Sequence, residues 1–285
     1  MGTIAAEVPE QITATTAPPP RHHRPWWRGK ILPVYSALVL LYLVTPILVM
    51  ILYSFNQSHA RLPQVSFKWQ GFTLQWYKQW NGIPGLTPAF RLTLILASLS
   101  AIVAAAVGTL LALALVRYRF RGKVATEQVM FLNIAAPEIV IGASLLGLFV
   151  TLNLPRGFDT LFLAHVTFCI AYVAITVRAR LAGFDRSLEE AAQDLGANAW
   201  VTFQKVTLPL IWPGVLAGAL MAFALSIDDF VISNFVAGNV ETFPLWIYGA
   251  VRVGIPPQVF VLGTVIFAAG VLIATLNLVL QRKKK

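Results

Sequence analysis

The stretch Leu92–Val116 reads LTLILASLSAIVAAAVGTLLALALV and contains no charged residue. It exceeds the roughly 20 apolar residues that an α-helix needs to cross the hydrocarbon core of a bilayer. Comparable apolar runs occur at Ile31–Phe55, Gln128–Leu152, Thr160–Val177, Pro213–Phe235 and Pro257–Leu280. We therefore predict an all-α integral membrane protein with six transmembrane helices.

The composition fits a chain with much of its surface in lipid. Only 12% of the 285 residues are charged, against about 25% in soluble domains, which is too little charge to cover a water-facing surface. The net charge of +10 would indicate nucleic acid in a soluble protein. Here the basic residues cluster between apolar runs. We therefore expect the chain to contact membrane lipid and not to bind nucleic acid. The single cysteine, Cys169, excludes an internal disulfide, and no zinc-type Cys/His spacing occurs.

The distribution of Lys and Arg predicts the orientation. Cytoplasmic loops of membrane proteins carry an excess of these residues. Most of the 22 lie in alternate segments, as Arg21, Arg24, Arg28 and Lys30; Arg117, Arg119, Arg121 and Lys123; Arg178, Arg180, Arg186 and Lys205; and Arg282 to Lys285. The other segments hold Arg61, Lys68, Lys78, Arg91, Arg156 and Arg252. We therefore expect a multi-pass protein of the cytoplasmic membrane with both termini in the cytoplasm.

The N-terminal residues 1–25 differ from the rest of the chain. They contain Pro18, Pro19 and Pro20 and few apolar side chains, a composition typical of disordered segments. The apolar run that follows is too long for the core of a signal peptide. We predict a disordered cytoplasmic tail at 1–25 and one membrane domain at 26–285.

Two further patterns concern packing. The outer segment 56–91 is rich in aromatic residues, which either form a belt at the membrane interface or a docking surface. Small residues recur at four-residue spacing, which lets helices approach closely in a membrane. These residues are Ala97, Ala101 and Ala105 in one run and Gly214, Gly218 and Ala222 in another.

The cytoplasmic connection at about 182–212 carries its own helical signals. Residues 187–196 read SLEEAAQDLG, in which Ser187 and Glu190 have the spacing of a capping box. Gly196 is a suitable left-handed stop, and a second short helix is expected from Asn198 to before Pro209. The segment is either a docking site for a soluble partner or a self-packed loop.

The same connection resembles the EAA loop of binding-protein-dependent ABC importer permeases. The shared features are Glu190-Ala191-Ala192, Gly196 after three intervening residues, and the terminal Leu208-Pro209. Val206 stands where that family more often has isoleucine, and the loop precedes the penultimate predicted helix, as in the family. The resemblance implies a type I ABC importer permease-like bundle. It also implies that a short coupling helix at Glu190, Ala191, Ala192 and Gly196 sits in a groove of an ATP-hydrolysing subunit.

Three acidic residues lie inside apolar runs: Glu138, Asp228 and Asp229. A carboxylate at the bilayer centre costs about 2.5–3.5 kcal/mol on insertion scales, so such residues usually face a bundle interior or a water-filled path. His165 is the one titratable candidate partner in the runs. Unpaired carboxylates favour a cationic substrate. Alternatively, each acid caps a broken helix or bonds backbone near Pro137, or the acids form a proton relay.

The surroundings of these acids resemble the spermidine/putrescine permease subfamily. The matching stretches are Ser226–Gly238, Phe243–Leu245, Val251–Ile255, Gly71–Tyr77 and the pair Pro137-Glu138. The resemblance covers about residues 31–281, and iron, sulfate and sugar permeases share much of the framework. A polyamine carries two or more ammonium groups, which suits carboxylates and aromatic faces.

These patterns predict a transporter subunit rather than an enzyme. No GxxxxGK[ST] phosphate loop occurs, so a partner is expected to hydrolyse ATP, and no cofactor or metal is expected. By resemblance, the partners are an ATP-binding subunit dimer, a second homologous permease and an extracytoplasmic substrate-binding protein. The alternatives are the same class of permease for iron, an anion or a sugar, and a proton-driven carrier or membrane enzyme acting alone.

Overall fold

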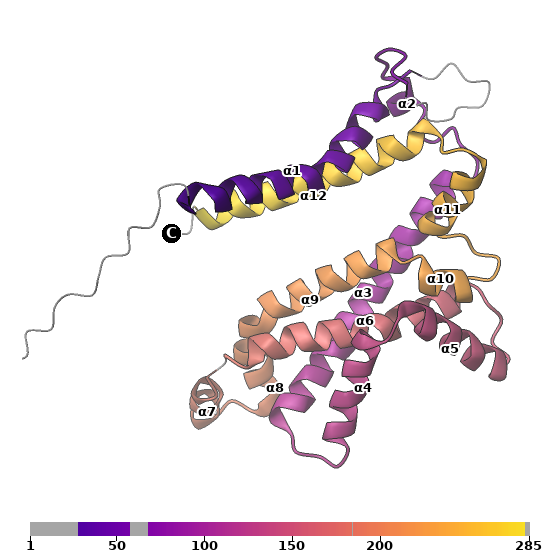
Figure 1. Ribbon diagram of the computed structural model, residues 1–285. Coiled ribbons are helices and arrows are strands. Elements are labelled where there is room, and N and C mark those ends of the chain that lie inside the picture. The colour runs from indigo at the N-terminus through magenta and orange to yellow at the C-terminus, as the bar shows by residue number, and fades with distance from the viewer. Residues whose placement is uncertain (1–27, 58–67, 184, 283–285) are drawn as a thin grey trace, which may run out of the picture. The chain divides into compact units, whose positions relative to one another are not determined.

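The computed structural model describes residues 28–57, 68–183 and 185–282, so the predicted tail at 1–25 lies outside the described residues. Within the described ranges the chain is helical, apart from an isolated antiparallel bridge between Asn56 and Phe72. The helices (Figure 1) are α1 Arg28–Ser54, α2 Gln75–Lys78, α3 Leu86–Arg117, α4 Lys123–Ala135, α5 Glu138–Thr151, α6 Phe158–Leu181, α7 Ser187–Asp194, α8 Ala199–Thr202, a π-helix Phe203–Thr207, α9 Leu208–Asp228, α10 Val231–Val236, α11 Phe243–Val253 and α12 Pro257–Arg282.

The predicted all-helical membrane architecture is confirmed, whereas the number of six spans stays a prediction. In the described ranges, stretches long and apolar enough to cross a membrane are Leu32–Ser54, Leu86–Arg117, Phe158–Leu181 and Ala199–Asp228. The pair α4 and α5, bent by 115°, counts as one more if it is a broken span. In α12 the apolar stretch Pro257–Leu272 is shorter than these.

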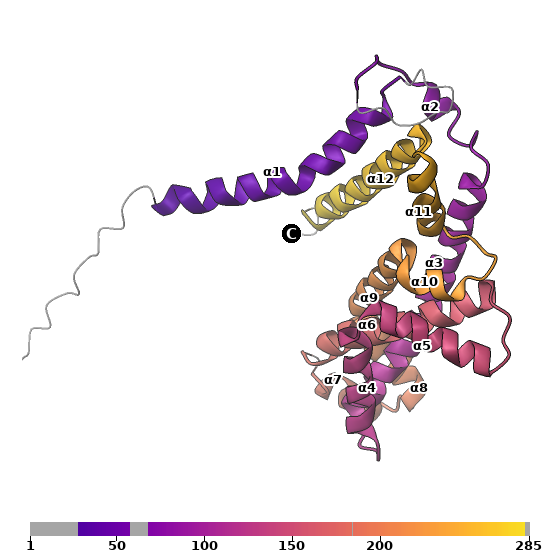
Figure 2. The same ribbon diagram turned by 45° about the vertical axis from the view of Figure 1, so that its right-hand side comes forward.

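The chain divides into two compact units, residues 1–49 and 50–285. In the first, the described part is the beginning of α1, whose apolar side chains from Leu32 onward are largely exposed. The second unit contains the hydrophobic core, which lies mainly between α3, α6 and α9. Figures 1 and 2 both show α6 and α9 side by side against α3.

Small residues make this core possible, as the four-residue spacing predicted. A Cβ atom on Gly108 of α3 would lie 2.8 Å from Cβ of Val173 in α6, and one on Gly218 of α9 would lie 3.2 Å from Cγ1 of the same valine. The predicted small residues are all buried: Ala97, Ala101, Ala105, Gly214, Gly218 and Ala222.

Two of the predicted runs are broken, and the breaks are neighbours. The first lies at Ala136 and Pro137, between α4 and α5; Ala136 is extended, as expected for a residue before proline. The second lies between α9 and α10. The broken pieces pack together, because α10 lies on α5 and Gly142 faces the ring of Phe235. Both breaks therefore fall in one region of the second unit, around the acidic residues.

The outer segment is organised around a buried indole. Trp76 is buried, and its Nε1 donates to the carbonyl of Asn56 at 2.9 Å. The hydroxyl groups of Ser54 and Tyr77 lie 2.7 Å apart. Neither a lipid belt nor a docking surface therefore accounts for Trp76, whereas Trp69 and Trp80 are exposed and keep both alternatives open.

Candidate functional site at two helix junctions

The N-terminus of α7 is held by Asp185 rather than by the predicted capping box. Oδ1 of Asp185 accepts a hydrogen bond from the backbone N–H of Ser187 at 2.9 Å. Ser187 already belongs to the helix, and the residue before it, Arg186, makes no side-chain cap. The predicted capping box of Ser187 and Glu190 is therefore wrong. The carboxylate of Asp185, two residues before Ser187, accepts the hydrogen bond from the backbone N–H of Ser187 instead. Hydrogen bonds from Ser187 hold the pKa of Asp185 below its usual value.

The end of α7 follows the prediction. Gly196 has φ of +89°, in the left-handed region that favours glycine. Its N–H donates to the carbonyl of Gln193 at 2.8 Å, and the N–H of Ala197 donates to Ala192 at 3.0 Å. These bonds satisfy carbonyl groups at the end of α7, so Gly196 sets a sharp stop.

The second helix of the loop begins as predicted but does not end where expected. Oδ1 of Asn198 accepts from the N–H of Val201 at 2.9 Å, which caps α8. The helix then continues through the π-helix Phe203–Thr207 directly into α9. The prediction that it stops before Pro209 is wrong. Pro209 stands in the first turn of α9, where its missing N–H is tolerated, and the wider π turn precedes it.

The outward side of the loop is not covered by the described part of the chain. Of the predicted coupling residues, Glu190, Ala191 and Gly196 are exposed and Ala192 is half-buried. Apolar side chains are exposed as well: Leu195 is 89% exposed and Trp200 63%. Exposed apolar side chains of this kind are typical of a docking surface. At the loop's end, Leu208 packs against the core and Pro209 is exposed.

The inward side of α7 carries a residue that the sequence did not single out. Glu189 is 7% exposed, and its Oε1 accepts hydrogen bonds from the guanidinium of Arg117 and the hydroxyl of Thr207. Arg117 ends α3, and Thr207 ends the π-helix. The family motif includes Glu190 and not Glu189. The one sequence feature that could have indicated Glu189 is a possible basic partner, Arg117, the first residue of a basic cluster.

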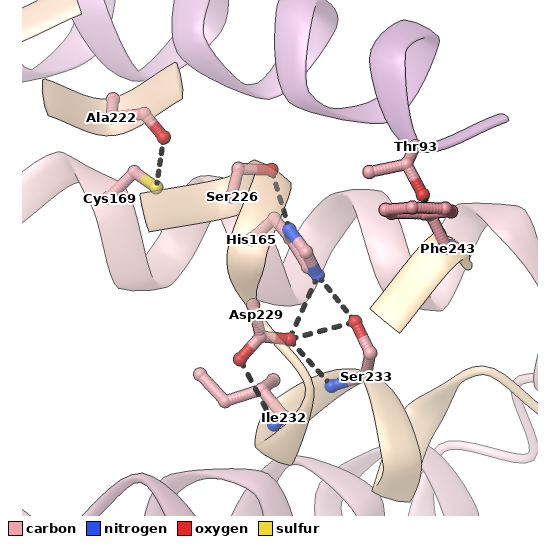
Figure 3. Close-up of polar contacts among 9 residues, drawn as sticks. All are labelled: Thr93, His165, Cys169, Ala222, Ser226, Asp229, Ile232, Ser233 and Phe243. Atoms are coloured by element: carbon pink, nitrogen blue, oxygen red, sulfur yellow. Dashed lines mark hydrogen bonds and ion pairs between the residues drawn. The ribbon is translucent and has the colours of Figure 1, made fainter. Parts of the chain in front are cut away.

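The second junction is the break between α9 and α10, where Asp229 is bonded on several sides (Figure 3). Oδ2 accepts from the N–H of Ser233 at 2.8 Å and from its hydroxyl at 2.8 Å, and Oδ1 accepts from the N–H of Ile232 at 3.2 Å. Asp229 therefore caps α10. Of the alternatives weighed for the acids, capping of a broken helix is confirmed for this residue.

His165 of α6 completes the network. Figure 3 shows its ring between the end of α9 and the start of α10. Nδ1 lies 2.7 Å from Oγ of Ser226, and Nε2 lies 3.0 Å from Oγ of Ser233 and 3.4 Å from Oδ2 of Asp229. The expectation that the acids are unpaired is therefore wrong for Asp229, since polar partners surround this buried carboxylate as a dry interior requires.

The other two acids are exposed. Asp228 is the last residue of α9, and Glu138 is the first residue of α5, directly after Pro137. The C-terminal end of a helix carries partial negative charge, so α9 and Asp228 together favour a cation. Among the described residues, no group of three or more His, Cys, Asp or Glu is arranged to hold a metal ion.

Comparison with known proteins shows the family to which this chain belongs. Residues 104–284 match the family of binding-protein-dependent transport system inner membrane components. The chain belongs to this family. It is 39% identical over 251 residues to the spermidine/putrescine transport system permease protein PotC of Escherichia coli K12, covering 88% of this chain and 93% of PotC. It is 41% identical over 236 residues to the putrescine transport system permease protein PotI of the same strain, covering 80% and 82%.

A solved structure has the same fold. A bacterial ABC transporter involved in the import of the acidic polysaccharide alginate aligns with a TM-score of 0.64 at 18% identity, covering 92% of this chain and 99% of that one. The predicted ABC importer permease-like bundle is thereby confirmed. Membership of the family implies an ATPase and a substrate-binding protein as partners, which argues against a carrier that acts alone.

Proposed function

We propose that this chain is a permease subunit of an ATP-driven importer that moves putrescine or spermidine across the cytoplasmic membrane. The observation that carries the proposal is the exposed carboxylate of Asp228 at the C-terminal end of the broken helix α9. Helix end and carboxylate both attract a cation at a position where the transmembrane helix is interrupted. The similarity to two permeases named for polyamines supports the same class of substrate.

The complex we propose has four kinds of component. A second homologous permease pairs with this chain, an ATP-binding subunit dimer lies on the cytoplasmic side, and an extracytoplasmic protein delivers the substrate. ATP is hydrolysed by the partner, and both termini of this chain lie in the cytoplasm. The exposed residues Leu195 and Trp200 support contact with the ATPase, since the described residues of this chain leave them uncovered.

The predicted residues divide into two roles. Glu190, Ala191, Ala192 and Gly196, with Leu208 and Pro209 at the end of the loop, transmit the action of the ATPase. Asp228 and Glu138 face the substrate. Asp229 was grouped with them from sequence, but its carboxylate is occupied by Ser233, Ile232 and His165. We therefore propose that Asp229 shapes the path by fixing the helix break and does not bind the cation itself.

The test is uptake of labelled putrescine by the complete complex in proteoliposomes. We expect Asp228→Asn to reduce uptake at least tenfold and Glu138→Gln to reduce it less, while both complexes assemble. Asp159→Asn is the matched control, because it removes an exposed carboxylate in the first turn of α6, a helix that forms neither break. Unchanged putrescine uptake by the Asp228→Asn complex would contradict the role of Asp228, whereas absence of putrescine uptake by the wild-type complex would contradict the polyamine assignment and favour a permease for another solute.

A further inference from the structure

The proposed coupling helix α7 is bonded to α3 and to the π-helix through the carboxylate of Glu189. Within α7, all of which the structure describes, Glu189 is the one buried residue. Its Oε1 contacts both the guanidinium of Arg117 and the hydroxyl of Thr207. Arg117 also donates to Oγ1 of Thr207 at 3.4 Å. We call Arg117, Glu189 and Thr207 the α7 anchor.

An anchor is physically necessary because α7 cannot hold its own position. A helix of eight residues is too short to be stable alone, and apolar side chains of α7 and its flank, Leu188 and Leu195, are exposed rather than packed on this chain. A buried carboxylate is favourable only while its partners are in place. The position of α7 therefore depends on the anchor more than on hydrophobic packing.

The anchor leads into the two helices that reach the membrane core. Arg117 is the last residue of α3, and Thr207 directly precedes Leu208, the first residue of α9. Both helices pack against α6 and against each other. At its other end, α9 finishes at Asp228 and the break (Figures 1 and 2). A force on α7 thus acts on the start of the helix whose end carries the proposed substrate carboxylate.

A cavity and a π-helical turn lie beside the anchor. A cavity of about 460 Å³ adjoins the anchor and is lined by Leu113, Gln193, Trp200 and Phe203, among others. The π-helix Phe203–Thr207 lies between α8 and α9, and π-helical turns are rare and often occur at functional sites. The loop therefore combines a buried, bonded carboxylate at Glu189 with a cavity and a π-helical turn beside it, an arrangement that leaves room for α7 to shift.

We propose that Glu189 is a positioning residue that fastens α7 to α3 and α9, so that ATP-driven movement received at α7 reaches the helix break at Asp228. This inference rests on the proposed function only in requiring an ATPase that acts on α7. The group in contact with the ATPase is Glu190, on the exposed side, and the group that passes the movement inward is Glu189. Without the anchor, α7 follows the ATPase while α3 and α9 stay in place.

The experiment measures substrate uptake per ATP hydrolysed in the complete complex, together with hydrogen exchange of the α7 backbone amides. We expect Glu189→Gln to lower uptake per ATP at least fivefold and to raise α7 exchange at least tenfold. The matched control is Glu127→Gln, which removes a carboxylate bonded to Arg178 at 3.0 Å without touching α7. The charge exchange of Arg117→Glu with Glu189→Arg should recover a substantial part of both values.

The outcomes separate the anchor from the substrate assignment. Absence of putrescine uptake by the wild-type complex counts against the polyamine function, whereas hydrogen exchange of α7 reads the anchor without any substrate. If Glu189→Gln and Glu127→Gln show the same hydrogen exchange of the α7 amides, the proposed role of the α7 anchor is contradicted. If Glu189→Gln prevents assembly, recovery of assembly by the charge exchange supports the anchor. Failure of the charge exchange to improve on the single variants overturns it.

Discussion

Two pairs of adjacent acids, one in the cytoplasmic loop and one in the broken helix, have the same internal arrangement. In Glu189-Glu190, the first residue is buried among partners and the second is exposed. In Asp228-Asp229, the first is exposed and the second is buried among partners. In both pairs one carboxylate is bonded at a short helix, α7 or α10, and its neighbour is exposed, as the proposed contact with a partner protein or a ligand requires.

The backbone explains how neighbours separate. On a helix, consecutive side chains do not face each other, so Glu189 and Glu190 of α7 diverge by the helical rotation alone. Asp229 diverges from Asp228 because its own backbone is extended, with ψ of 118°. The first pair is thus divided by helix geometry and the second by the end of a helix. Either helix geometry or a helix end can therefore place a bonded carboxylate and an exposed carboxylate next to each other in sequence.

The largest effect expected from breaking this arrangement is on stability at Asp229. Asp229→Ala leaves the buried N–H groups of Ile232 and Ser233 without their acceptor, and each such loss costs about 1–3 kcal/mol. We expect the midpoint of thermal unfolding of the purified permease to fall by roughly 6 °C or more. The measurement is thermal unfolding in detergent, followed by tryptophan fluorescence.

Asp228→Ala is the comparison for this experiment, since it removes the adjacent carboxylate from an exposed position. We expect its midpoint to lie within roughly 2 °C of wild type while transport is lost. Equal destabilisation by both variants would show that the two acids do not divide into a support and a working group.

An intermediate effect is expected at the exposed member of the loop pair. Glu190→Gln should weaken association of the ATPase subunit about tenfold, which is about 1.4 kcal/mol, because it removes an exposed charge from the docking side. Hydrogen exchange of α7 should stay at the wild-type value, in contrast to Glu189→Gln. Titration of labelled ATPase subunit onto the permease in nanodiscs gives the affinity. A change in α7 exchange with unchanged affinity would reverse the two roles.

The sequence predicted the elements well where one physical signal dominated. The lengths of the apolar runs predicted long membrane helices, and the spacing of small residues predicted close helix packing at Gly218. Gly196 and Asn198 predicted the turn between the two short helices of the loop. The roles of the acids were less accessible, because they depend on contacts between distant elements. His165 and Asp229 are separated by α7, α8 and α9 in sequence, and Arg117 meets Glu189 from another helix. No local pattern distinguishes a bonded carboxylate from a free one.

The helix boundaries failed for a related reason. Ser187 and Glu190 have the right spacing for a capping box, but capping depends on which acceptor reaches the amide first, and Asp185 does. Pro209 indicated a helix end, yet a π turn directly before it allows the helix to continue. Several local hydrogen-bonding arrangements are possible at such helix ends. The sequence alone does not show which of them forms.

The smallest effect is expected at Asp185, which also provides a pH test of how α7 begins. Its pKa is lowered in the fold by hydrogen bonds from Ser187, so its support is complete above the ordinary Asp pKa of about 3.9 and is lost as pH falls through the lower folded value. At neutral pH, Asp185→Ala should raise hydrogen exchange at the first amides of α7 a few fold and leave those near Asp194 unchanged. Because the carboxylate is fully exposed, solvent competes for the same bond, and the deeper attachment at Glu189 should hold the helix in place. Loss of all α7 protection in Asp185→Ala would mean that the helix depends on its first turn rather than on the anchor.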